Sequence, residues 1–145
     1  MLADPLQNMN SRQARAHSYT KLGYYELAIK DYDEALRINA KDAWSYWQRA
    51  FTYSQLDQHQ RAINDYDEAL KIDTKDVSAY LNRGVSFGKI SQHQRAIDNY
   101  DMAIQIDPED ALTYNNRGIA YRKLGRYTER DADKAKACSL NSKYC

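Results

Sequence analysis

The chain has 145 residues, and its 21 Lys and Arg residues almost balance 20 Asp and Glu residues, giving a net charge of +1. This balance argues against the basic footprint typical of nucleic-acid-binding proteins and against attraction to an anionic membrane. The mean hydropathy of −0.87 and the lack of a long apolar run predict no transmembrane helix. With no signal peptide visible and only two cysteines, Cys138 and Cys145, we expect a cytoplasmic protein.

Residues that break helices are scarce along the whole chain. There are 5 glycines and 2 prolines, whereas average usage would give about 10 and about 7 in a chain of this length. This scarcity predicts long helices and argues against a sheet protein with many turns.

An internal repeat organises almost the whole sequence. The segment 58–63 recurs unchanged at 92–97, and the segment 31–36 recurs unchanged at 65–70, so both recur 34 positions apart. Two such matches at one offset indicate tandem duplication. After an N-terminal extension at 1–8, the period predicts a single domain at 9–144, built from the repeats 9–42, 43–76, 77–110 and 111–144.

Each repeat carries apolar residues at the three- and four-residue spacing of two amphipathic helices. In the second repeat these helices are expected at 43–56 and 60–72, with a break at Asp57. Gly23 and Gly125 are expected to end the first helix of the outer repeats, because glycine adopts a left-handed backbone without a steric penalty. An Asn or Asp precedes the first helix of every repeat as an expected N-cap: Asn8, Asp42, Asp76 and Asp110.

Arginine recurs at position 7 of every repeat, and an acid or amide recurs at position 23. A strip of arginines could bind an acidic ligand, but the matching acid is supplied at the same period. We therefore expect repeated structural pairs that tie each helix to its partner helix or to the next repeat. The arginines are Arg15, Arg49, Arg83 and Arg117, and their expected partners are Asp31, Asp65, Asn99 and Asp133.

The 34-residue unit resembles the tetratricopeptide repeat over roughly residues 9–144. Small residues occupy the family's close-packing positions, where they let two helices approach each other. The resemblance implies an all-α, right-handed solenoid of four helical hairpins, with eight helices. The packing residues that carry it are Ala16, Ala50, Gly84 and Gly118 at position 8, Ala28, Ala62 and Ala96 at position 20, and Ala35, Ala69, Ala103 and Ala137 at position 27. At position 20 the fourth repeat departs from the pattern with Arg130.

The resemblance also implies which residues face a concave groove. An apolar, aromatic groove with a basic rim suits an amphipathic helix or extended segment with apolar anchors. We therefore expect a non-catalytic module that binds a peptide or helix of a partner protein. The expected partner-binding residues are Trp44, Trp47, Phe51, Leu81, Val85, Leu112, Asn115 and Ile119, with Lys89 and Arg122 on the rim.

Other site chemistries find less support in the sequence. The basic residues with which chaperone-adaptor members of the family clamp a terminal carboxylate are missing from the corresponding positions, so that mode is not expected. No nucleophile motif, phosphate loop or paired-cysteine metal signature occurs. His59 and His93 share one repeat position, which duplication alone explains. We expect no catalytic residues, no cofactor and no metal.

Three alternatives remain open at this stage. The apolar residues of the groove could bury themselves in a homo-oligomer, making the chain a self-assembling scaffold, or they could hold the chain's own segment at 1–8. Aromatic residues at helical spacing are commonly core, although Tyr46 already fills the aromatic core position beside Trp44 and Trp47.

Cys138 is expected to pack in the last helix and Cys145 to be an exposed thiol, unless the chain end turns back to form a disulfide.

Overall fold

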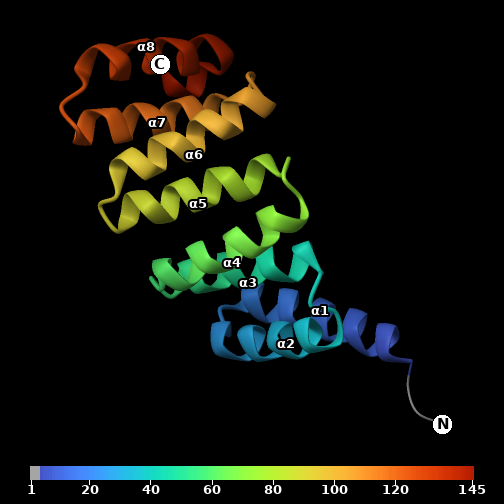
Figure 1. The fold of residues 1–145 in the computed structure, drawn as a ribbon. Helices are drawn as coiled ribbons and strands as arrows, with labels where there is room; N and C mark the ends of the chain where they lie inside the picture. The colour runs from blue at the N-terminus through green and yellow to red at the C-terminus, as the bar shows by residue number, and fades with distance from the viewer. Residues whose placement is uncertain (1–3) are drawn as a thin grey trace. The chain divides into compact units, whose positions relative to one another are not determined.

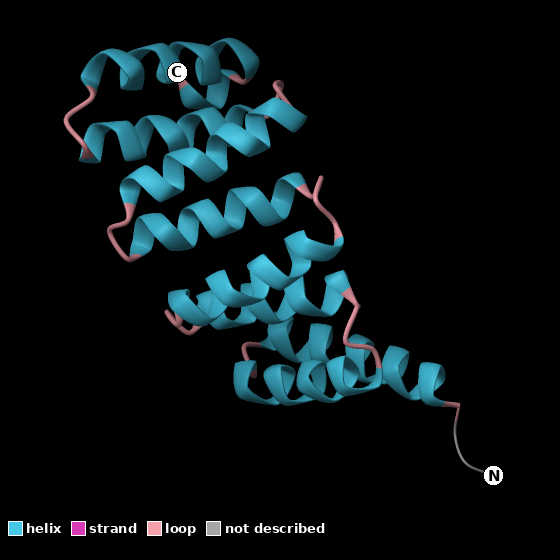
Figure 2. Ribbon diagram, viewed as in Figure 1, coloured by secondary structure: helices cyan, strands magenta, loops and turns pink. Residues whose placement is uncertain are grey.

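The computed structural model describes residues 4–145, which form helices and loops without strands over that range (Figure 2). The chain divides into two compact units, the first ending at Thr74 and the second spanning Lys75–Cys145. Each unit contains two helical hairpins (Figure 1). Unit 1 holds α1 (Pro5–Leu22), α2 (Tyr25–Ile38), α3 (Ala43–Gln55) and α4 (His59–Ile72); unit 2 holds α5 (Val77–Lys89), α6 (His93–Ile106), α7 (Ala111–Lys123), α8 (Tyr127–Leu140) and the short η1 (Ser142–Tyr144).

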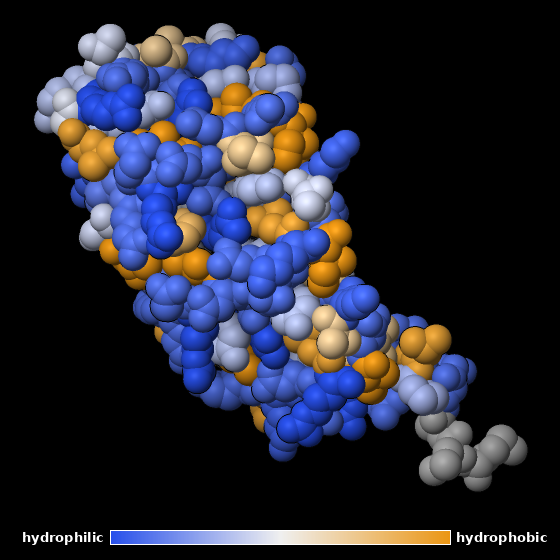
Figure 3. Space-filling view, in the orientation of Figure 1, coloured by the Kyte–Doolittle hydropathy of each residue, from blue (hydrophilic) through white to orange (hydrophobic). Residues whose placement is uncertain are grey.

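The eight expected helices are confirmed. In the second repeat, the ends of α3 and α4 agree with the predicted ends to within one residue. Asp42, Asp76 and Asp110 cap α3, α5 and α7, because each carboxylate accepts a hydrogen bond from a backbone N–H of the first helical turn. Within the described residues, no helix combines the length and the apolar character that crossing a bilayer requires. Hydrophilic side chains cover most of the face drawn in Figure 3, with smaller hydrophobic areas between them.

The start of the first helix differs from the prediction. The helix α1 begins at Pro5, and Asp4 is its N-cap, with a carboxylate oxygen 3.3 Å from the backbone nitrogen of Leu6. Asn8 lies inside the helix, where its side chain accepts a hydrogen bond from Arg12, so the expected cap at Asn8 is wrong. A proline in the first turn favours this earlier start, because the first N–H groups of a helix have no intrahelical partner. Residues 1–3 lie outside the described part of the chain.

A left-handed residue ends the first helix of every hairpin at the same repeat position. Gly23 and Gly125 have φ angles of 81° and 73°, as the sequence predicts. The two inner hairpins reach the same conformation with non-glycine residues, since Asp57 has a φ of 56° and Ser91 a φ of 63°. The repeat geometry thus imposes this turn on all four hairpins, at a steric cost where the residue has a Cβ.

Small residues hold the two helices of each hairpin together. In unit 1 the alanines at positions 8, 20 and 27 of both repeats are at most 1% exposed, so the helices approach each other at these points. Larger rings fill the space beside them, and Tyr32 and Tyr66 are completely buried. In unit 2, Ala96, Ala103 and Ala137 are also completely buried.

The predicted arginine pairs form in both units. Arg49 donates two hydrogen bonds of 2.7 Å to Asp65, and a third of 2.6 Å reaches Asp33 in the preceding repeat. Arg117 makes the same pattern in unit 2 with Asp133 and Asp101. The two-pronged bond to position 23 closes a hairpin, and the third bond joins successive repeats, which supports a structural role.

The chain end turns back after α8. The η1 turn packs on α8, and Cys138 and Cys145 form a disulfide with their Cα atoms 4.6 Å apart. The expectation of a free, exposed thiol at Cys145 is therefore wrong. The side chain of Asn141 supports the turn by accepting a hydrogen bond from the backbone N–H of Lys143. This turn brings Tyr144 back toward the helices of unit 2.

Candidate partner-binding surface

In unit 1 the aromatic residues of α3 pack against one another. The rings of Trp47 and Phe51 are stacked at 5.7 Å with an interplanar angle of 4°, and Trp47 meets the buried ring of Tyr66 edge-on. The indole Nε1 of Trp47 is buried and has no hydrogen-bond partner among residues 4–145. Trp47 is therefore partly a packing residue of unit 1.

Trp44 is the more accessible of the two tryptophans. It is 43% exposed, while its ring lies 6.2 Å from that of His17 and 6.1 Å from that of Tyr32. Two neighbouring rings thus contact the indole, while much of its surface stays accessible to a partner. Exposed tryptophan is costly in water and is enriched at energetic hot spots of interfaces.

In unit 2 the groove-facing residues of α5 and α7 surround a cavity of about 500 Å³, which we call the Tyr100 pocket. Its apolar lining includes Val85 from α5, Ile119 from α7 and the buried ring of Tyr100 from α6. Lys89 and Lys123 also line it and are exposed to solvent. The full lining is Val85, Gly88, Lys89, Ser91, His93, Ala96, Tyr100, Asn116, Ile119, Ala120 and Lys123.

Two glycines of α5 shape this pocket in different ways. A Cβ added to Gly84 would lie 2.6 Å from the ring of Tyr100, so this glycine lets the ring pack directly on the helix backbone. A Cβ added to Gly88 would meet no atom within 4 Å. Gly88 therefore leaves open space in the pocket lining, whereas Gly84 fixes the ring beside it.

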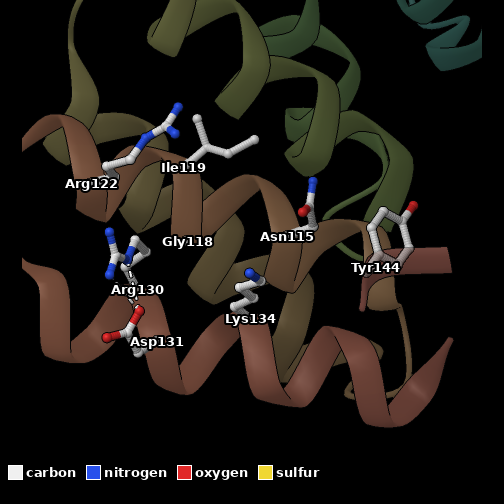
Figure 4. A pocket seen from close by; sticks show the side chains of 8 residues that line it. All are labelled: Asn115, Gly118, Ile119, Arg122, Arg130, Asp131, Lys134 and Tyr144. Atoms are coloured by element: carbon white, nitrogen blue, oxygen red, sulfur yellow. Dashed lines mark hydrogen bonds and ion pairs between the residues drawn. The ribbon is translucent and has the colours of Figure 1, made fainter. Parts of the chain in front are cut away.

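A second cavity of about 350 Å³, the Tyr144 pocket, lies between α7, α8 and the C-terminal turn (Figure 4). Asn115, Gly118, Ile119 and Arg122 come from α7, and Ile119 is shared with the Tyr100 pocket. The remaining lining residues are Arg130, Asp131 and Lys134 from α8 and Tyr144 from η1.

Positive charge dominates the electrostatics of both pockets. In the Tyr144 pocket Arg130 is paired with Asp131 at 2.7 Å, whereas Arg122 and Lys134 have no acidic partner among the described residues. Lys89 and Lys123 of the Tyr100 pocket also have no acidic partner within residues 4–145. Burial raises the pKa of Tyr100 far above its ordinary value, because the ionised phenolate would lose its hydration there.

The repeat family follows from a comparison of the sequence with known families. The profile described as TPR repeat matches residues 16–57, 55–91 and 89–125, and the profile described as tetratricopeptide repeat matches residues 111–144. The chain belongs to the tetratricopeptide repeat family. Tetratricopeptide repeats form protein-interaction modules, which confirms the functional class expected from the sequence.

Solved structures with the same fold include other tetratricopeptide repeat proteins. A crystal structure of MamA superposes with a TM-score of 0.90 at 24% identity, covering 94% of this chain and 80% of that one. The Arabidopsis OM64 TPR domain has a TM-score of 0.78 at 23% identity over 82% of this chain and 98% of its own. The first TPR of Spaghetti (RPAP3), bound to the HSP90 peptide SRMEEVD, has a TM-score of 0.79 at 20% identity over 82% and 94%. No curated protein matches the sequence.

The tetratricopeptide fold distributes the predicted site residues over both units. Trp44, Trp47 and Phe51 belong to unit 1. In unit 2, Val85, Lys89 and Ile119 line the Tyr100 pocket, and Asn115, Ile119 and Arg122 line the Tyr144 pocket. Leu81 and Leu112 line neither cavity, although Leu112 is 41% exposed. The role of these residues in binding remains a prediction.

Sequence reasoning missed Arg130, Lys134 and Tyr144. The departure of Arg130 from the alanine at position 20 of the other tetratricopeptide repeats was visible, and it marks the Tyr144 pocket. Tyr144 could not be found in this way, since its placement depends on the turn after α8. Among the described residues, no three His, Cys, Asp or Glu side chains come together as metal ligands.

Proposed function

We propose that the chain is a non-catalytic interaction module that binds a segment of a partner protein, with an apolar side chain of that segment seated in the Tyr100 pocket. The observation that carries the proposal is the open cavity bounded by Val85, Gly88 and Ile119 beside a buried ring. A surface cavity that is apolar and carries a few polar groups is the usual form of a ligand site.

The dimensions and the rim of the pocket indicate the kind of anchor. A cavity of about 500 Å³ has room for a large aliphatic or aromatic side chain. Lys89 and Lys123 lie at its exposed edge, where their ammonium groups reach solvent and can meet polar groups of the bound segment. An amphipathic helix or an extended segment would supply such an anchor.

The accessible indole of Trp44 supports a further contact in unit 1. It is 43% exposed and already packs against the rings of His17 and Tyr32, so little side-chain entropy would be lost when a partner covers it. The peptide complex of the first TPR of RPAP3 supports a peptide as the ligand of this fold.

A selection of short random peptides on the full-length chain tests the proposal. We expect peptides with a large apolar residue to bind the wild-type protein. Gly88→Leu should fill the pocket and weaken their binding about 30-fold or more. Gly88→Ala is the matched control, because its methyl group enters open space and leaves most of the cavity free. Equal binding by the wild type and Gly88→Leu would overturn the proposal.

Self-assembly is the second candidate function, and one patch of unit 1 favours it. Leu22, Tyr24 and Leu27 surround the turn between α1 and α2, and they are 68%, 56% and 49% exposed. Light scattering during size-exclusion chromatography tests this candidate. A dimer that dissociates in Leu22→Ser/Leu27→Ser supports a scaffold, and a monomer at high concentration excludes it.

A further inference from the structure

We propose that the Tyr144 pocket is a separate subsite for acidic side chains of the bound segment, next to the subsite for its apolar anchor. This inference rests on the proposed function, since the two pockets meet at Ile119. It names the chemistry of the partner: a segment in which Asp or Glu residues accompany a large apolar residue.

The lining of the Tyr144 pocket carries more positive than negative charge. Arg122, Arg130 and Lys134 line the cavity, and Asp131 is the acidic residue in its lining. Because Asp131 already pairs with Arg130, the charges of Arg122 and Lys134 are left uncompensated within the described residues. Asn115 and Tyr144 add an amide and a phenol that can donate hydrogen bonds to a carboxylate.

Position 20 of the fourth repeat differs from position 20 of the other three repeats. Position 20 holds Ala28, Ala62 and Ala96 in the first three repeats, and each of these side chains is completely buried. The fourth repeat holds Arg130 there, which is accommodated beside Gly118, with the Arg130 backbone oxygen 3.5 Å from the Cβ that Gly118 lacks. A small residue that packs the two helices of a hairpin together elsewhere in the chain is thus replaced by a cation that lines a cavity.

The distribution of the cations decides what kind of anion fits. Figure 4 shows Arg122, Arg130 and Lys134 spaced along the two helices rather than directed at one point. Lys89 and Lys123, which have no acidic partner in the described part of unit 2 or unit 1, add positive charge on the Tyr100 side of Ile119. A single phosphate or a terminal carboxylate would meet only part of this charge, whereas a segment with several acidic side chains complements all of it.

Binding of selected peptides tests the subsite. Peptides are selected on the wild-type chain and synthesised with C-terminal amides, and each is compared with a version in which Asp and Glu are replaced by Asn and Gln. We expect the acidic version to bind about tenfold more tightly at low salt and to lose that advantage at high salt. A free C-terminus should add little, because the subsite accepts side-chain carboxylates.

Two sets of variants assign the effect to the pocket. Arg122→Ala/Lys134→Ala should remove most of the acidic preference, and Arg130→Ala, which restores the alanine of the other repeats, should reduce it without loss of thermal stability. The control Lys30→Ala/Lys41→Ala removes the same charge from exposed positions of unit 1 and should preserve the preference.

The possible results separate the subsite from the proposed function. Peptides that bind, depend on Gly88 and show no acidic preference would overturn the subsite and leave the Tyr100 pocket in place. An acidic preference that survives Arg122→Ala/Lys134→Ala would also overturn it, as would a preference lost equally in Lys30→Ala/Lys41→Ala. A selection that yields no binding peptide would overturn both proposals.

Discussion

The groove side of α3 in unit 1 and the groove side of α5 in unit 2 are filled differently. In unit 1, Trp47 and Phe51 at positions 5 and 9 stack on each other. In unit 2, position 9 holds Val85 and position 12 holds Gly88, and the side chains there leave a cavity of about 500 Å³. The hairpins of both units have the same backbone fold. The volume of a few side chains therefore determines whether the groove side of a helix packs on itself or leaves a cavity.

The difference distinguishes two roles of groove-side residues: packing within their own unit and binding of a partner. Large rings on the groove side of a helix give stability to their own unit when they touch each other, and their contribution to binding is then reduced. Small residues opposite a fixed ring, as at Gly88 and Tyr100, preserve space for a side chain of a partner.

The largest expected effect concerns the tryptophans of unit 1. Trp47→Ala should lower the free energy of unfolding by about 3 kcal/mol, because it removes a ring that is stacked on Phe51 and touches Tyr66. Trp44→Ala should cost less than about 1.5 kcal/mol, because much of that ring is exposed. Urea unfolding monitored by circular dichroism measures both. Equal losses would contradict the distinction between a packing ring and an accessible one.

Alkaline pH probes the buried rings. Burial raises the pKa of Tyr32 from 10.0 to about 12. The stability that comes from keeping this phenol neutral is fully present below pH 10 and should be lost as the pH rises to 12, by about 2–3 kcal/mol. Tyr32→Phe should lose less stability over that interval than the wild type, whereas Tyr127→Phe, at an exposed position, should behave as the wild type does. Identical alkaline profiles for the wild type and Tyr32→Phe would be inconsistent with this assignment.

The two glycines of α5 should respond to alanine with opposite signs. Gly84→Ala should destabilise the fold by about 1–2 kcal/mol, since its methyl group would collide with the ring of Tyr100. Gly88→Ala should stabilise it by about 0.5–1 kcal/mol, since alanine favours a helix and the space is free. Thermal unfolding of both variants gives the comparison, and a loss of stability in Gly88→Ala would show that the pocket is closed.

The smallest effect concerns the left-handed turns within the inner hairpins. Asp57→Gly in unit 1 and Ser91→Gly in unit 2 should each raise the free energy of unfolding by about 0.5–1 kcal/mol, because glycine adopts a positive φ without strain. Differential scanning calorimetry would detect the change. As a control, Gly23→Ala should lower stability, and a gain there would contradict the argument.

The repeat period made the fold predictable, whereas the pockets were only partly so. A 34-residue period indicates which small residues lie between the helices and which arginine meets which acid or amide, because most of these contacts recur from copy to copy. Val85, Ile119 and Arg122 could be placed on the groove side for the same reason. The start of α1 and the disulfide were not predicted, since chain ends lack a neighbouring repeat to define them. The size of the Tyr100 pocket could not be predicted, because it depends on how the ring of Tyr100 packs on α5 beside Gly84.

Methyl NMR spectra of the full-length chain test the central claim most directly. The claim is that the open cavity of unit 2 receives the apolar anchor. Titration with a peptide selected on the wild-type protein should shift the methyl signals of Val85 and Ile119 most strongly, with no comparable response in Gly88→Leu. Unchanged Val85 and Ile119 signals, with saturable shifts elsewhere in the chain, would contradict it.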